Sequence, residues 1–159
     1  MIQDIKEFFE EKKVKDQAVI ELGLSDEGKI TKELAPLFND VFLVTHDLEG
    51  LEDCFESLQE FDNIHCAPFH LYEPGDLPIP NAGVIAAVLN SADDYNKTIS
   101  DLTRVISDKN KHIRYVVITK SGRAEVDKAV MEAITNNTSI EVVSHPSLTI
   151  LYIDRLRSL

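Results

Sequence analysis

The sequence predicts an α/β fold in which helices cover both faces of a mostly parallel sheet. Short apolar runs rich in β-branched residues alternate along the chain with segments whose apolar residues recur at helical spacing. The apolar runs are continuous, as expected for strands that are buried on both faces. The last two runs are separated only by residues 145–147, which predicts a terminal antiparallel hairpin.

Each element has its own signal in the sequence. An N-terminal helix, residues 1–14, is predicted by an apolar stripe made of Ile2, Ile5, Phe8 and Phe9. Strands are expected at residues 17–22, 41–44, 63–67, 83–89, 112–119, 139–144 and 148–153. The other helices are expected at residues 31–39, from Leu48 onward, at residues 93–110 and after Gly122.

Two segments stand out from this alternation. The helix that starts at Leu48 is expected to bury a wide apolar face, which consists of Leu48, Leu51, Cys54, Phe55 and Leu58. Residues 71–82 carry three prolines and are predicted to form an ordered loop, because proline disrupts the hydrogen bonding of helices and strands.

Composition limits the classes of function. With 159 residues, of which 43% are apolar, the chain is expected to form one domain, residues 1–159. It has no long apolar segment and no leader of the secretory type, so we expect a cytoplasmic protein that does not bind membranes. The net charge of −12 disfavours nucleic acid as a partner. A small molecule or a neutral-to-basic protein fits this charge better.

The chain is organised around residues 18–37, which are expected to form a buried strand, a turn bounded by glycines and a helix. The strand ends in Glu21-Leu22-Gly23, and a polar loop leads through Gly28 into an amphipathic segment. In open α/β sheets, ligands bind at the loops that follow the carboxyl ends of the strands. The sequence therefore predicts a ligand site at this turn.

This stretch resembles motif I of the class I S-adenosylmethionine-dependent methyltransferases, in which an acid and a glycine end the first strand and a helix, here ITKELA, follows the loop. Further segments resemble other motifs of that family in the same order: VFLVTHD, NIHCAPFHLYEPGDLPIP, GVIAAVLNS and DYNKTISDLTRVISDKNKHIRYVVITK. The resemblance implies a Rossmann-like three-layer sandwich. Its seven-stranded sheet would have the order 3-2-1-4-5-7-6 and a C-terminal antiparallel hairpin.

The resemblance also implies a site for S-adenosylmethionine across the strand ends. The positions that match the family's motifs are Glu21, Gly23, Ser25 and Gly28 for the methionine part, Thr45, His46 and Asp47 for the ribose, Phe69 and His70 for the adenine, and Asn90 beside the methyl group. Glu21 is expected to hold the cofactor's amino group through a charge-assisted hydrogen bond.

The sequence departs from the family's pattern at several of these positions. The loop keeps Gly23 and Gly28 where the family has three close glycines, and the ribose position is Thr45 instead of an acid. Two functions follow: a methyl-transferring protein acting on a small molecule or a protein, or a non-catalytic binding or assembly protein, such as a homodimer, that has lost the cofactor. A third is an α/β domain for another small molecule, because a fold does not determine a function.

Other chemistries have weaker support. No G-x-x-x-x-G-K-[ST] motif is present, and Asp26 and Glu27 would repel a phosphate from the following helix. His46, Asp47 and His70 lie at expected strand ends but not at the spacing of a metal motif, so we assign no metal site. His70 has the ordinary pKa range of a general base, yet no motif marks a catalytic group. We therefore assign no catalytic residue.

Overall fold

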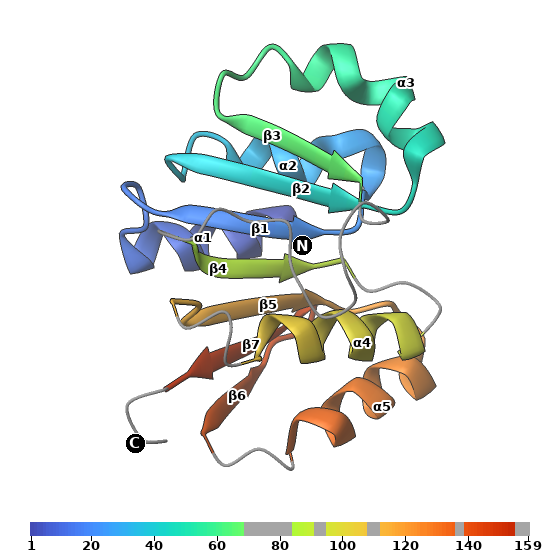
Figure 1. Cartoon of the computed structure of the whole chain (residues 1–159). Coiled ribbons are helices and arrows are strands. Elements are labelled where there is room, and N and C mark those ends of the chain that lie inside the picture. Colours follow the sequence, from blue (N-terminus) through green and yellow to red (C-terminus); the bar gives the residue numbers. More distant parts are fainter. Residues whose placement is uncertain (69–83, 91–94, 108–111, 136–138, 155–159) are drawn as a thin grey trace.

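A seven-stranded sheet forms the centre of the computed structural model, which describes residues 1–68, 84–90, 95–107, 112–135 and 139–154. The strand order is β3-β2-β1-β4-β5-β7-β6, and β7 runs antiparallel to both of its neighbours while the other pairs are parallel (Figure 1). The strands are β1 Ala18–Leu22, β2 Asp40–Thr45, β3 Ile64–Pro68, β4 Val84–Leu89, β5 Tyr115–Thr119, β6 Ile140–Ser144 and β7 Leu148–Ile153. The predicted fold class, strand order and terminal hairpin are confirmed.

Helices cover both faces of this sheet. In Figure 1, α1 (Ile2–Lys12) and α2 (Lys29–Leu34) lie behind the sheet, and α4 (Tyr95–Val105) and α5 (Ala124–Thr135) lie in front of it. Successive residues of β1 point into different cores, since Val19 packs with the α1 and α2 side chains and Ile20 with those of α4 and α5. All five residues of β1 are buried, which explains the continuous apolar run in the sequence.

Three details of the predicted helices are wrong, one of which is that the helix expected at residues 93–110 is α4, which ends at Val105. The helix expected at residues 31–39 is α2, which ends at Leu34, because Pro36 has no N–H with which to continue the helical hydrogen bonds. In α3 (Leu48–Leu58), Leu48 is 45% exposed and Phe55 is 41% exposed, so the buried face is narrower than expected. Because α3 covers the β2 and β3 end of the sheet, only Cys54 and Leu58 pack fully against Leu43 there.

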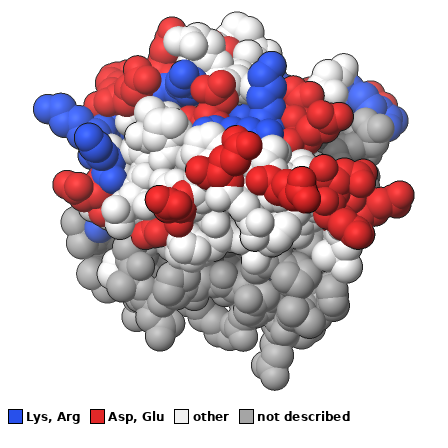
Figure 2. Space-filling view, turned by 90° about the horizontal axis from the view of Figure 1, so that it is seen from above, with Lys and Arg blue, Asp and Glu red and all other residues white. Residues whose placement is uncertain are grey.

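The outer face of α3 is acidic. Its exposed charged residues are Glu49, Glu52, Asp53 and Glu56. Figure 2 views this end of the sheet from above and shows acidic side chains over much of the described surface, with fewer basic ones. This distribution agrees with the net charge of −12.

The proline-rich segment predicted to be a loop, residues 71–82, lies outside the described residues. Within the described ranges, no helix is both long enough and apolar enough to cross a membrane.

Asp47 begins α3 as its N-cap. Its side chain accepts a hydrogen bond from the backbone N–H of Gly50 at 2.9 Å, and its own backbone N–H donates to Oγ1 of Thr45 at 3.0 Å. A Cβ added at Gly50 would collide with the Asp47 carboxylate. Glycine at position 50 therefore allows the capping carboxylate to approach the helix end.

This contact predicts a coupling between Asp47→Ala and Gly50→Ala. Alanine is favoured over glycine in helices by roughly 0.5–1 kcal/mol, so Gly50→Ala should stabilise the protein when Asp47 has already been replaced by alanine. In the wild-type background the same change should lose that gain, because it displaces a cap worth about 1 kcal/mol. Urea unfolding of the two single variants and the double variant measures the coupling, and simple additivity would contradict the proposed contact.

Candidate functional site

Loops from three strands meet α4 around a cavity at the carboxyl ends of β1, β2 and β4. The cavity has a volume of ≈ 150 Å³ and is lined by Leu22, Gly23, Leu24, Ser25, Thr45, Asp47, Asn90, Lys97, Thr98 and Asp101. The predicted site residues in this set are Gly23, Ser25, Thr45, Asp47 and Asn90. The fold thus brings together side chains from positions far apart in the sequence.

The other predicted site residues lie elsewhere. Glu21 and Gly28 are buried away from the cavity, and His46 is exposed just beyond β2. Gly28 instead packs against α3, where an added Cβ would lie 3.0 Å from Cδ2 of Leu58. The remaining two, Phe69 and His70, lie outside the described residues.

Gly23 and Asn90 join the ends of three strands. Gly23 has a φ of +94°, and its backbone N–H donates to the carbonyl oxygen of Val44 at 2.8 Å. Nδ2 of Asn90 donates to the carbonyl oxygen of Gly23 at 2.5 Å, so the β4 end is tied to the β1 loop. A side chain at position 23 would be strained by this φ, and its Cβ would contact the Cβ of Asn90 at 3.4 Å.

The loop after Gly23 has a left-handed backbone without the expected number of glycines. Asp26, Glu27 and Gly28 have φ values of 51°, 55° and 81° within the short 3-10 helix Asp26–Gly28. A left-handed backbone costs a residue other than glycine roughly 1–2 kcal/mol. Asp26 and Glu27 are exposed and line a separate cavity of ≈ 360 Å³ between the loop and α3. The cavity beside Gly23 is lined on this side by Leu24 and Ser25.

Glu21 is buried in the centre of the sheet with an exposed fraction of 0%. Its two carboxyl oxygens accept hydrogen bonds from Oγ1 of Thr31 at 2.8 and 3.0 Å, and one of them accepts from Nδ2 of Asn90 at 3.3 Å. Burial raises the pKa of Glu21 to about 8, although the hydrogen bonds from Thr31 and Asn90 act in the opposite direction. The carboxyl group is therefore predominantly protonated at neutral pH.

The side-chain amide of Asn90 is satisfied at one end only. Its Nδ2 donates to Glu21 and to Gly23, whereas the buried Oδ1 has no hydrogen-bond partner among the described residues. A buried acceptor without a donor costs free energy. This atom fits a ligand that brings an N–H or O–H donor into the cavity.

Sequence reasoning missed the contribution of α4 to the cavity. Thr98 and Asp101 are 4% and 9% exposed and lie one helical turn apart, on the side of α4 that also buries Leu102 and Val105. Burial raises the pKa of Asp101, while the charges of Lys97 and Arg104 lower it. The sequence did contain a signal for this contribution. Thr98 and Asp101 share the helical spacing of the apolar residues Leu102 and Val105, which places two polar residues on the inward face of the helix.

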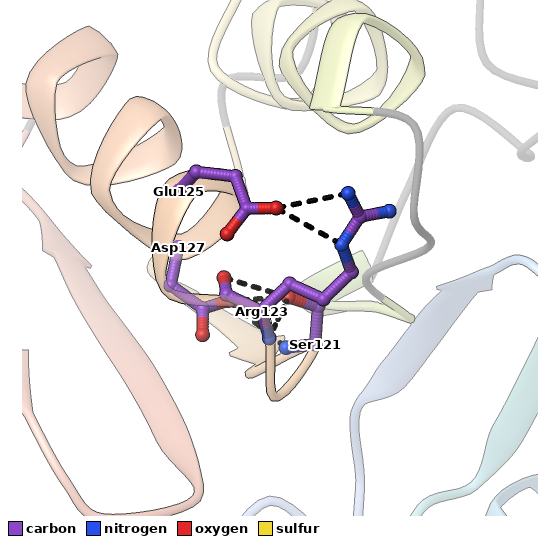
Figure 3. A network of polar contacts seen from close by, with 4 residues as sticks. All are labelled: Ser121, Arg123, Glu125 and Asp127. Atoms are coloured by element: carbon purple, nitrogen blue, oxygen red, sulfur yellow. Dashed lines mark hydrogen bonds and ion pairs between the residues drawn. The ribbon is translucent and has the colours of Figure 1, made fainter.

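A second polar cluster, after β5, is structural. The backbone N–H and the hydroxyl of Ser121 both donate to Oδ1 of Asp127 at 2.9 Å, and Arg123 donates to Glu125 through two nitrogens at 2.9 and 3.2 Å (Figure 3). These four residues hold the turn that leads into α5, and none of them lines the cavity. Among the described residues, no three His, Cys, Asp or Glu side chains gather in a group that would hold a metal ion.

Comparison with solved structures identifies the fold. An rRNA methylase from Streptococcus thermophilus has a TM-score of 0.66 at 14% identity, and the match covers 96% of this chain and 95% of that one. A putative methyltransferase from Streptococcus mutans in complex with SAH has a TM-score of 0.68 at 13% identity, with 97% and 98% coverage. A precorrin 8w decarboxylase from Methanobacterium thermoautotrophicum has a TM-score of 0.65 at 14% identity, with 95% and 89% coverage.

The chain therefore has the fold of the class I methyltransferases. No protein-family model and no curated protein matches its sequence. The residues at the cavity fit the amino-acid end of S-adenosylmethionine, because the buried Oδ1 of Asn90 lacks a donor and Gly23 places no side chain against Asn90. The volume of ≈ 150 Å³ matches one end of a ligand, since whole small-molecule sites occupy roughly 300–1,000 Å³.

The buried Glu21 predicts a pH dependence of stability. Its folded pKa of about 8 exceeds the ordinary value of 4.5, so the folded state holds a proton that the unfolded state releases over this range. Glu21 therefore contributes its full share to the free energy of unfolding below pH 4.5. This contribution is lost as the pH rises to 8, by about 1.4 kcal/mol per pH unit at most. Glu21→Gln should flatten this decline in urea unfolding between pH 5 and 8. The exposed Glu56→Gln should retain the wild-type slope, and equal slopes in wild type and Glu21→Gln would contradict the assignment.

The left-handed loop predicts an unusual order of stability for two variants. Glu27→Gly should be more stable than Glu27→Ala by about 1 kcal/mol, because both remove the carboxylate and only glycine is unstrained at a φ of 55°. At Glu132, exposed on the helix α5, the order should be reversed. Urea unfolding of the four variants measures both differences. If Glu27→Ala were more stable than Glu27→Gly, the left-handed backbone at this position would be ruled out.

Proposed function

We propose that this chain binds S-adenosylmethionine at the carboxyl ends of β1, β2 and β4 and transfers its methyl group. The observation that carries the proposal is the cavity beside Gly23. It is lined by several of the positions that match the family's motifs: Gly23, Ser25, Thr45, Asp47 and Asn90. The side chains of Asp26 and Glu27, which replace the expected small residues, lie on the other cavity and leave this one open. The bound SAH in a neighbour of the same fold supports the choice of ligand.

The residues around the cavity would divide the binding of this ligand among them. Gly23 and Ser25 would lie along its methionine part, and Thr45 and Asp47 would face the ribose. Asp47 is held in place by its cap on α3, and Asn90 by its two hydrogen bonds to β1 and the loop. Such fixed groups are suited to orienting a ligand at little further entropic cost.

The cofactor would supply an electrophilic methyl group on its sulfonium. The protein's part would be to hold an acceptor atom in line with that group and to exclude water, which accounts for large rate effects without an acid or base. Asn90 is the described residue at the end of β4, where the matched position lies beside the methyl group. No described side chain is assigned a catalytic step.

The acceptor that we propose is a small molecule or a protein. A net charge of −12 and the acidic surface over α3 in Figure 2 would repel a phosphate backbone. An uncharged or cationic acceptor meets no such repulsion. The rRNA methylase among the structural neighbours shares the fold, and its substrate is not part of this proposal.

Two observations favour cofactor binding over a non-catalytic role. The loop at Asp26 and Glu27 keeps a left-handed backbone despite its cost to non-glycine residues. The buried acceptor on Asn90 is also left without a partner, as expected for an atom reserved for a ligand. A protein that kept only the scaffold would have no use for either feature.

Thermal unfolding with S-adenosylhomocysteine tests the proposal. At a concentration 100 times the dissociation constant, ligand binding should stabilise the protein by about 2.7 kcal/mol and raise the melting temperature by about 5 °C. Ser25→Trp should abolish the shift, because Ser25 lines the cavity and its extended backbone tolerates a large side chain. Ser100→Trp, at an exposed position of α4, should keep it.

The controls separate the possible failures. If the wild-type protein shows no shift at millimolar S-adenosylhomocysteine or S-adenosylmethionine, the proposed function is wrong. If both tryptophan variants shift as wild type does, the ligand binds at another place. Incubating the wild type with labelled S-adenosylmethionine and pools of small-molecule or protein acceptors then measures transfer of the methyl group.

A further inference from the structure

The α4 wall of the cavity carries an acid to which the proposed function assigns no role. Asp101 lines the cavity beside Thr98 and is 9% exposed. Its carboxylate accepts no hydrogen bond from any residue in the described part of the chain. The charges of Lys97 and Arg104 offset only part of the cost of burying this carboxylate. A cationic donor that arrives with a ligand would remove this cost.

A second acceptor lies on the same cavity without a donor. Oδ1 of Asn90 is buried and unpartnered, and the nitrogen of the same amide is engaged by Glu21 and Gly23. Asn90 and Asp101 both line a space of ≈ 150 Å³, and each carries an acceptor to which no described residue donates. An ammonium group carries three donors and a positive charge, so it can satisfy both acceptors at once.

We propose that Asp101 and Oδ1 of Asn90 bind the protonated amino group of the cofactor's amino-acid end, in place of Glu21. The inference rests on the proposed function and names the group that would recognise one end of the ligand. It differs from the expectation from sequence, in which Glu21 holds this amino group. Asp101 is thus a specificity residue, which selects ligands that carry an ammonium.

The surroundings of the other two acids support this assignment. Glu21 is fully buried within β1, and both of its carboxyl oxygens take part in hydrogen bonds with Thr31 and Asn90. It does not line the cavity. Asp47 does line the cavity, but its carboxylate already accepts the backbone N–H of Gly50 as the cap of α3. Asp101 is the acid on this cavity to which no described residue donates a hydrogen bond at either oxygen, whereas Asp47 accepts one at Oδ1.

Titration calorimetry with two ligands tests the inference. The ligands are S-adenosylhomocysteine and its analogue that lacks the α-amino group and keeps the carboxylate. The wild type should bind S-adenosylhomocysteine at least 10-fold more tightly than the analogue. Asp101→Asn should reduce this ratio to near 1, by weakening the binding of S-adenosylhomocysteine while leaving the analogue's affinity unchanged. The exposed Glu56→Gln should keep the wild-type ratio.

The results distinguish this inference from the proposed function. If the wild type binds neither ligand, both are overturned. If the wild type binds and Asp101→Asn keeps the full preference, the cofactor site stands and the role of Asp101 is wrong. Equal loss of both ligands in Asp101→Asn would indicate a general disturbance of the cavity and would also overturn the inference.

The stability of the unliganded variant provides a second readout. Asp101→Asn removes a charge whose burial outweighs the attraction of Lys97 and Arg104, so its melting temperature without ligand should equal or exceed that of the wild type. A residue kept for stability would behave in the opposite way. A lower melting temperature without ligand would therefore contradict the assignment of Asp101 to ligand binding.

Discussion

The buried carboxyl group of Glu21 holds together the segments that build the site. It accepts hydrogen bonds from Thr31 on α2 and from Asn90 at the end of β4, while Asn90 also binds the carbonyl of Gly23 in the loop after β1. Burial keeps this group protonated near neutral pH, so no isolated charge lies in the core. The positions of the loop, the helix and the neighbouring strand end depend on this one network.

This arrangement separates the structural acid from the acids that face a ligand. A charge at Glu21 would be costly under the sheet, and its oxygens are occupied. The polar groups that face the cavity come instead from β2, β4 and α4, where Thr45, Asn90 and Asp101 lie. The site can therefore differ in its chemistry from other proteins with the same backbone, even where the first strand ends in the same acid and glycine.

The fold by itself leaves the reaction undetermined. Two of the structural neighbours reported above are described as a methylase and a putative methyltransferase, and another as a decarboxylase, all at 13–14% identity. The argument for a cofactor site comes from local features: an open cavity, an orphaned acceptor and a left-handed loop that two acidic residues occupy at a cost in free energy. Each feature is unfavourable or unnecessary in the absence of a ligand.

The sequence by itself determined the fold class, because burial on both faces of a parallel sheet leaves continuous apolar runs, and its resemblance to a known family implied the strand order that the structure has. It also indicated the turn at Gly23 and the strand end at Asn90. Only the tertiary structure decided which polar groups meet. Asn90 reaches Glu21 across 69 positions, and α4 brings Asp101 to the cavity. Hydrogen bonding and desolvation depend on such distant neighbours, which a local pattern of residues does not contain.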